Sequence, residues 1–297
     1  MKSMNMYIDQ IVTEMTLFDD DVNMLFFDVA MEEEVAKNTT QASKEEPGMV
    51  DKMIDTVKKL FIRLNGLIQK NFLKFKNFMM KVAESDQGFE NEFRKAFKAK
   101  KPLTAIKLVT YDYNPNILDA ELLKINKVIQ GLFNGMVNKT SYTALSDTTT
   151  ANDMDRSPEE IYQMIFKELS CPGDVKDINT YFIHIKNKFR VDKKEILFKS
   201  SQTQEYYQMT KQHSMLMEKI KKSEGVVSNQ VATMKSNLHN TILNKQSRTE
   251  VKKRAVKQCK NLTHIMNFYI RFVDIYMQLN LERLFTYRTV LKKLYSF

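Results

Sequence analysis

Apolar residues recur at intervals of three and four along residues 51–84. Because successive residues of a helix are rotated by about 100°, these positions share one face, and cations at intervals of four and seven occupy the opposite face. The pattern predicts one long basic amphipathic helix. Its candidate packing or partner face consists of Phe61, Ile68, Phe72, Phe75 and Met79, and its candidate basic contact face of Lys59, Arg63, Lys70, Lys74 and Lys81.

The residues that follow predict a break and then a shorter helix. Ser85, Asp86 and Gly88 are expected to interrupt the long helix, because these residue types have low helix propensity. Phenylalanines at positions 89, 93 and 97 then repeat at the helical interval of four. The second helix ends at Lys100, Lys101 and Pro102, since a proline cannot continue a helix.

The segment TAIKLVTYDYNPN, residues 104–116, is the best strand candidate in the chain. It is rich in β-branched and aromatic residues and is bounded by Pro102 and Pro115. Helical spacing returns between Ile117 and Phe133, and residues 139–157 form a polar loop rich in Ser and Thr. We therefore expect at most a small β element, near residues 104–113.

Ser157, Pro158 and Glu160 predict the start of a helix. They supply a capping hydroxyl, a proline at the first helical position and a carboxylate three residues after the cap. The helix is predicted to run to about Ser170. Apolar spacing over residues 175–189 favours another helix, although residues 181–186 also permit a strand.

The last hundred residues show the most regular pattern. Helices are predicted over about 202–222 and 226–244, and a capping box at residues 247–250 precedes a long terminal helix. The apolar series of that helix is Val251, Ala255, Cys259, Leu262, Met266, Ile270, Val273, Met277, Leu281 and Leu284. The predicted fold is mainly α, an elongated helical bundle with long amphipathic helices. The predicted divisions are 1–46, 47–138, 139–157 and 158–297.

Charge separates the start of the sequence from the remainder. Residues 1–46 hold three lysines against eleven acids, a net charge of −8, so residues 47–297 carry +18. An acidic leader thus precedes a basic body, and such a body attracts phosphate, anionic lipid or an acidic protein surface. The alternative interpretation is that the leader and the body partly neutralise each other and that the charge serves no outside partner.

Candidate chemistry is sparse. The four histidines show no metal-ligand spacing, and Cys259 is interpreted as a small core residue. The sequence contains no phosphate-binding glycine loop and no nucleophile motif. We expect no catalytic residue, no cofactor and no metal, and therefore a protein that is not an enzyme. No signal peptide or transmembrane segment is predicted, which places synthesis in the cytoplasm.

The basic helix over residues 51–84 permits three interpretations. Its phenylalanine face can be the core of a bundle or the contact for a protein partner, with the lysines in solvent. The same pattern suits a helix lying on an anionic membrane. Nucleic acid is the third candidate partner, although the aromatic residues lie opposite the cations rather than among them.

The order of the segments resembles a known class of proteins. The acidic leader, the basic Phe/Lys helix, the stretch KLVTYDYNP and a terminal helix ending FTYRTVLKKL look like the uncharacterised virion structural proteins of large tailed bacteriophages and prophages of Gram-positive hosts. The resemblance implies a component of the capsid, the tail or the internal cargo, made in the bacterial host cytoplasm and assembled into the virion. It also implies trimming of the leader by a maturation protease. Other virion proteins or further copies of the chain would be its partners. The alternatives are a peripheral membrane protein and a nucleic-acid packaging protein.

Overall fold

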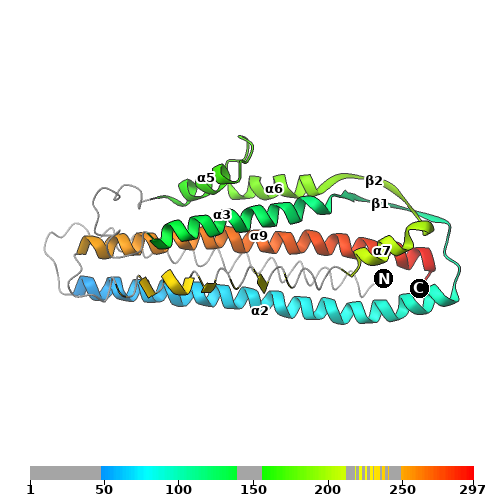
Figure 1. Ribbon diagram of the computed structural model, residues 1–297, viewed down its shortest axis with the longest axis horizontal. Helices are drawn as coiled ribbons and strands as arrows, with labels where there is room; N and C mark the ends of the chain where they lie inside the picture. Colours follow the sequence, from blue (N-terminus) through cyan, green and yellow to red (C-terminus); the bar gives the residue numbers. More distant parts are fainter. Residues whose placement is uncertain are drawn as a thin grey trace. The chain divides into compact units, whose positions relative to one another are not determined.

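The computed structural model describes residues 48–138, 156–211 and 249–297, with scattered residues between 218 and 240 (Figure 1). The chain divides into two compact units, Met1–Arg63 and Leu64–Phe297, and the contacts described below all belong to the second. Its elements are α2 (Gly48–Ala99, which begins in the first unit), β1 (Ala105–Tyr113), α3 (Pro115–Asn138), α5 (Pro158–Glu168), α6 (Ile178–Phe189), β2 (Arg190–Lys199), the short 3₁₀ helix η2 (Ser200–Gln202), α7 (Thr203–Met209) and α9 (Thr249–Tyr295).

Helices make up 77% of the described part of the chain, which confirms the prediction of a mainly α-helical protein. The predicted acidic leader, most of the predicted polar loop and most of the two helices predicted over 202–244 lie outside the described residues. Within 202–244, α7 begins where the first of these helices was expected but ends at Met209, so the prediction of one continuous helix to about residue 222 was wrong.

Helix α2 continues without a break through Ser85, Asp86 and Gly88, so the predicted interruption was wrong. The buried residues Val82, Phe89, Phe93 and Ala96 follow helical spacing across this region. Their packing outweighs the cost of one helical glycine, about 1 kcal/mol relative to alanine. Predicted helix boundaries based on local propensity fail here because the packing partners lie elsewhere in the sequence.

The terminal helix α9 spans 47 residues, as the apolar series predicted. Every member of that series is buried except Cys259, whose side chain lies outside the described residues. Burial nevertheless extends all round the helix, because Phe268, Phe272 and Tyr276 on its other sides are also fully enclosed. Helices α3, α5, α6 and α7 and strand β1 all contact α9.

The described residues contain one sheet, in which β1 and β2 pair antiparallel from Ala105 opposite Lys199 to Tyr113 opposite Arg190. Strand β1 confirms the prediction near residues 104–113. Strand β2 was not predicted, so the expectation of a β element only at that place was incomplete. The segment RVDKKEILFK is mostly exposed and polar, and it lacks the regular alternation that identifies a half-buried strand.

Helix α5 begins with the predicted capping box. The Ser157 hydroxyl accepts a hydrogen bond from the Glu160 N–H at 3.2 Å, and the Glu160 carboxylate accepts one from the Ser157 N–H at 2.7 Å. Residues 178–189 form helix α6, so the alternative of a strand over 181–186 was wrong. Asp177 caps this helix by accepting a hydrogen bond from the Thr180 N–H at 2.8 Å.

Candidate interaction surfaces

The predicted basic face of α2 falls mostly on side chains outside the described residues. Lys59 is exposed, whereas the side chains of Arg63, Lys70, Lys74 and Lys81 are not described. The same holds for the whole predicted packing face, namely Phe61, Ile68, Phe72, Phe75 and Met79. Both faces therefore stay predictions.

Described side chains farther along α2 give a more mixed surface than the predicted one. Leu73 and Met80 expose 58% and 52% of their area, and Lys76 is exposed between them. Val82, by contrast, exposes only 3%. The middle of α2 thus presents apolar side chains and a cation on the same outward face.

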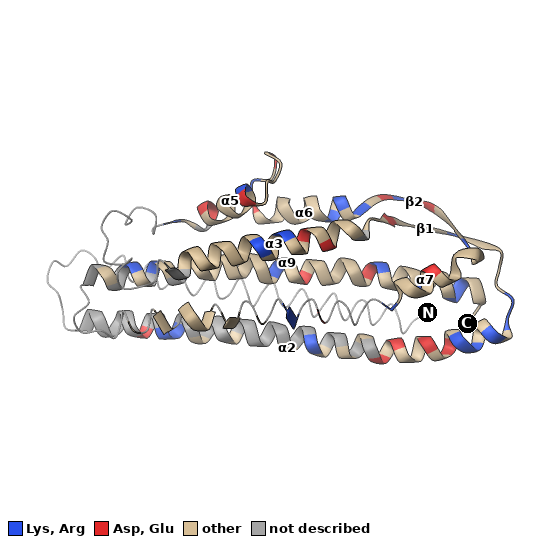
Figure 2. Ribbon diagram, viewed as in Figure 1, with Lys and Arg blue, Asp and Glu red and all other residues tan. Residues whose placement is uncertain are grey.

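A dense group of cations lies where α2 and α9 end. Between Arg94 and Lys101 five of eight residues are cationic and none is acidic. Figure 2 shows this charge in the last turns of α2 and in the chain that follows. The last turns of α9 add Lys292 and Lys293. We call these seven residues the basic end: Arg94, Lys95, Lys98, Lys100, Lys101, Lys292 and Lys293.

Backbone and side-chain bonds hold the two parts of the basic end together. The Leu103 N–H donates to the Leu294 carbonyl at 2.9 Å, and the Lys100 ammonium donates to the Ser296 carbonyl at 2.5 Å. The ring of Phe97 lies 5.6 Å from that of Tyr295, centre to centre. The segment after α2 is therefore fixed against the last turn of α9.

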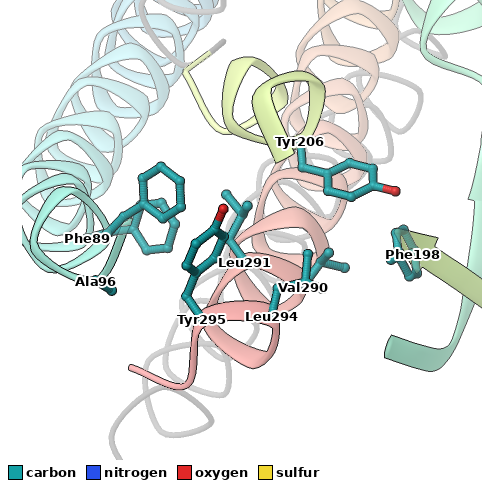
Figure 3. Close-up of a cluster of buried hydrophobic side chains, with 9 residues drawn as sticks. Phe89, Ala96, Phe198, Tyr206, Val290, Leu291, Leu294 and Tyr295 are labelled. Carbon is teal, nitrogen blue, oxygen red and sulfur yellow. The ribbon is translucent and has the colours of Figure 1, made fainter. Parts of the chain in front are cut away.

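An aromatic core lies directly beneath. In Figure 3, Phe89 and Ala96 of α2 lie on one side of the end of α9 and face Tyr295, while Tyr206 and Phe198 of α7 and β2 lie on the other. Phe93 contacts Tyr295 edge-to-face, with 5.5 Å between ring centres. This packing joins the ends of α2 and α9, from which the cations of the basic end project.

Two acids of α2 neutralise part of the basic end. Glu90 accepts hydrogen bonds from the Tyr207 hydroxyl at 3.0 Å, from Arg94 at 2.5 Å and from Lys211 at 3.3 Å. The bond from Tyr207 contributes most to lowering the pKa of the Glu90 carboxyl. Glu92 lies 3.9 Å from the Lys292 ammonium. Seven cations against two acids leave a net charge of +5.

One further cation near this end is buried. Arg288 is 2% exposed, pairs with Asp86 and donates a hydrogen bond to the Ser85 hydroxyl at 3.1 Å. Its guanidinium also lies 5.3 Å from the ring centres of Phe89 and Phe285. Burial lowers the pKa of Arg288 to about 10, which keeps it charged at neutral pH. This group joins α9 to α2 and is not available to a partner.

Three tyrosine hydroxyls make polar contacts between α3 and its neighbours. Tyr276 and Tyr269 of α9 donate to Asp119 and Asn126 of α3, at 2.8 and 2.9 Å. Tyr181 of α6 donates to Glu121 at 2.8 Å. Burial, reinforced by the neighbouring carboxylates, raises the pKa of both Tyr181 and Tyr276. The hydroxyls therefore stay neutral and act as donors.

The described residues contain no group of three or more His, Cys, Asp or Glu side chains placed to hold a metal ion. Cys171 is partly buried, and burial raises the pKa of its thiol to about 11, so at neutral pH the sulfur is not a thiolate nucleophile. His264 is buried on α9 with its ring edge-on to Tyr162, the ring centres being 6.4 Å apart.

The basic end was missed by reasoning from the sequence, which interpreted Lys100 to Pro102 only as a helix stop. The run RKAFKAKK carried a signal, because cations interleaved with an aromatic residue mark a surface for anionic partners. No sequence signal showed that Lys292 and Lys293 belong to the same surface, since this depends on a contact between segments almost two hundred residues apart.

Comparisons with known proteins give no relative. No protein-family model, curated protein or solved structure matches the chain. Among the helices of the described residues, none combines the length and the apolar character needed to cross a membrane.

Proposed function

We propose that this chain is a non-enzymatic structural and interaction protein whose helices form a bundle around α9, and that it is a component of a tailed-bacteriophage particle. The observation that supports a structural role is that the tyrosine hydroxyls around α3 bond one helix to another. The hydroxyls of Tyr181, Tyr269 and Tyr276 each join two elements distant in sequence. Groups bonded in this way position helices and are not free to transfer protons to a substrate.

The proposal of a virion component rests on the resemblance of KLVTYDYNP, residues 107–115, and of FTYRTVLKKL, residues 285–294. Most of the first stretch lies in β1, which ends at Tyr113, and the second lies at the end of α9. They meet through Tyr113, whose hydroxyl donates to Glu282 at 3.0 Å and lies 3.2 Å from the Thr286 hydroxyl. The two stretches that carry the resemblance thus lie next to each other in the folded chain, at the contact between Tyr113 and Thr286.

Quantitative mass spectrometry of purified particles tests the proposal. Particles from a culture whose phage or prophage encodes the chain are banded by density and washed with nuclease and detergent. We expect the chain at a fixed ratio to the major capsid protein in every fraction of the band. An abundant host cytoplasmic protein serves as the control for carry-over. Absence of the chain at high sequence coverage, or a ratio that follows the host protein, overturns the proposal.

A further inference from the structure

Five lysines of the basic end have no acidic partner among the described residues. Arg94 is paired with Glu90 and Lys292 lies near Glu92. The remaining cations are exposed: Lys95, Lys98, Lys100, Lys101 and Lys293. Two apolar side chains lie among them, Phe97 and Leu103, and each exposes 53% of its area.

Helix electrostatics explains only part of this arrangement. Cations are favourable in the last turn of a helix because the carbonyl ends carry partial negative charge, which accounts for Lys98, Lys292 and Lys293. That effect does not explain Lys100 and Lys101 beyond the helix, nor the exposed phenylalanine and leucine. Half-exposed apolar side chains next to lysines in the sequence, on a segment bonded to the last turn of α9, suit a surface that a partner covers.

We propose that the basic end docks on the surface of an anionic membrane. The lysines would contact lipid phosphates and carboxylates, and Phe97 and Leu103 would enter the boundary between headgroups and acyl chains. The fixed last turn of α9 holds both kinds of side chain together through the Leu103–Leu294 and Phe97–Tyr295 contacts. No part of the chain needs to span the bilayer for this attachment.

The residue types favour lipid over nucleic acid. Arginine is the preferred side chain for reading bases, and the one arginine of the basic end is bonded to Glu90. Single-stranded nucleic acid is bound by stacking on successive flat rings, and the basic end exposes one such ring, Phe97, beside the aliphatic Leu103. An exposed aliphatic side chain beside unpaired lysines gains free energy at a lipid interface, where it leaves water while the lysines meet charge.

Flotation of the full-length chain with vesicles tests the charge requirement. We expect binding to vesicles of phosphatidylcholine with phosphatidylserine and none to pure phosphatidylcholine. The triple variant Lys95→Gln, Lys98→Gln, Lys101→Gln should bind about a hundredfold more weakly, because each lysine near an anionic surface contributes roughly a fivefold factor. The matched control changes three exposed lysines elsewhere, Lys127, Lys176 and Lys188, to Gln. An equal loss in the control would mean that net charge alone drives binding and would overturn the site.

Leu103→Ser tests insertion, because it removes apolar area without changing the charge. We expect about a tenfold loss of vesicle binding with an unchanged melting temperature. Binding of the same proteins to a duplex and to a single-stranded oligonucleotide is measured in parallel. If the chain binds either oligonucleotide more tightly than vesicles, and Leu103→Ser has no effect, the basic end is a nucleic-acid surface and the membrane assignment is overturned. The absence of vesicle binding would also overturn the membrane assignment. The assay is independent of particle composition, so its failure is separable from failure of the virion proposal.

Discussion

The contact between α3 and α9 and the basic end use polar side chains in opposite ways. At the α3–α9 contact a tyrosine hydroxyl donates to each of the acceptors Asp119 and Asn126. At the basic end five lysines lack an acidic partner in the described part of the chain, and Phe97 is half exposed. The first arrangement stabilises the fold and the second contributes little to it. Free charge and exposed apolar area together mark the region suited to a partner.

The largest expected difference comes from truncating one phenylalanine in the packing around α9 and one at the basic end. Phe268 of α9 is fully buried against Phe166 and Phe182. Phe268→Ala should lower the free energy of unfolding by about 3 to 5 kcal/mol, because it removes buried area and leaves a cavity. The matched variant Phe97→Ala should cost less than half as much, since its ring is half exposed. Urea denaturation measures both, and equal costs would contradict the contrast.

A tyrosine hydroxyl should matter less, and its effect should depend on pH. At pH 7, Tyr276→Phe should cost about 1 to 2 kcal/mol, because Asp119 loses its donor. The pKa of Tyr276 is raised by burial, so the folded state keeps the neutral form while the unfolded tyrosine ionises near pH 10. This contribution to stability is complete below pH 10 and is lost above it, by about 1.4 kcal/mol per pH unit.

The advantage of the wild-type chain over Tyr276→Phe should therefore vanish near pH 11. Denaturation at pH 7, 9 and 11 measures it, and the other tyrosines affect both chains equally. Tyr111→Phe is the control, because its ring lies over Arg190 and Lys193 and is kept in the variant. A wild-type advantage that is constant from pH 7 to 11 would show that the Tyr276 hydroxyl is not buried in the folded chain.

The sequence predicted those elements whose evidence is local. The apolar series of α9 and the capping box at Ser157 depend on neighbours within a few turns, and both were confirmed. The continuity of α2 was not predicted, because Phe89 and Phe93 gain their burial from α9. Strand β2 was missed because its exposed residues show no periodic signal, and only its pairing with β1 makes it a strand.

The candidate sites divide in the same way. A run of lysines beside Phe97 can be recognised in the sequence, but which of its charges are already paired cannot. Glu90 binds Arg94 and also Lys211, which is more than one hundred residues away. The free lysines become distinguishable from the paired ones only when the folded chain brings all these groups together.

The smallest expected effect concerns two helix ends, that of α5 and that of α9 at the basic end. Ser170 after α5 and Ser296 after α9 have positive φ, at 49° and 52°. In both, the next N–H bonds back to the helix, from Cys171 to the Phe166 carbonyl at 2.9 Å and from Phe297 to the Lys292 carbonyl at 3.3 Å. This is the closing geometry that glycine favours, because a side chain makes positive φ costly. Ser170→Gly should therefore stabilise the chain by about 1 kcal/mol.

Ser296→Gly should gain less, since its closing bond is longer, at 3.3 Å against 2.9 Å. Thermal melts of the two glycine variants measure the difference, with Ser170→Ala as the control that removes the hydroxyl but keeps the strain. Ser296→Gly retains the Ser296 carbonyl that Lys100 bonds, so vesicle binding should be unchanged. A gain at Ser296 equal to that at Ser170 would show that the last turn of α9 is held as firmly as the end of α5. The basic end would then be a structural region as well as a contact surface.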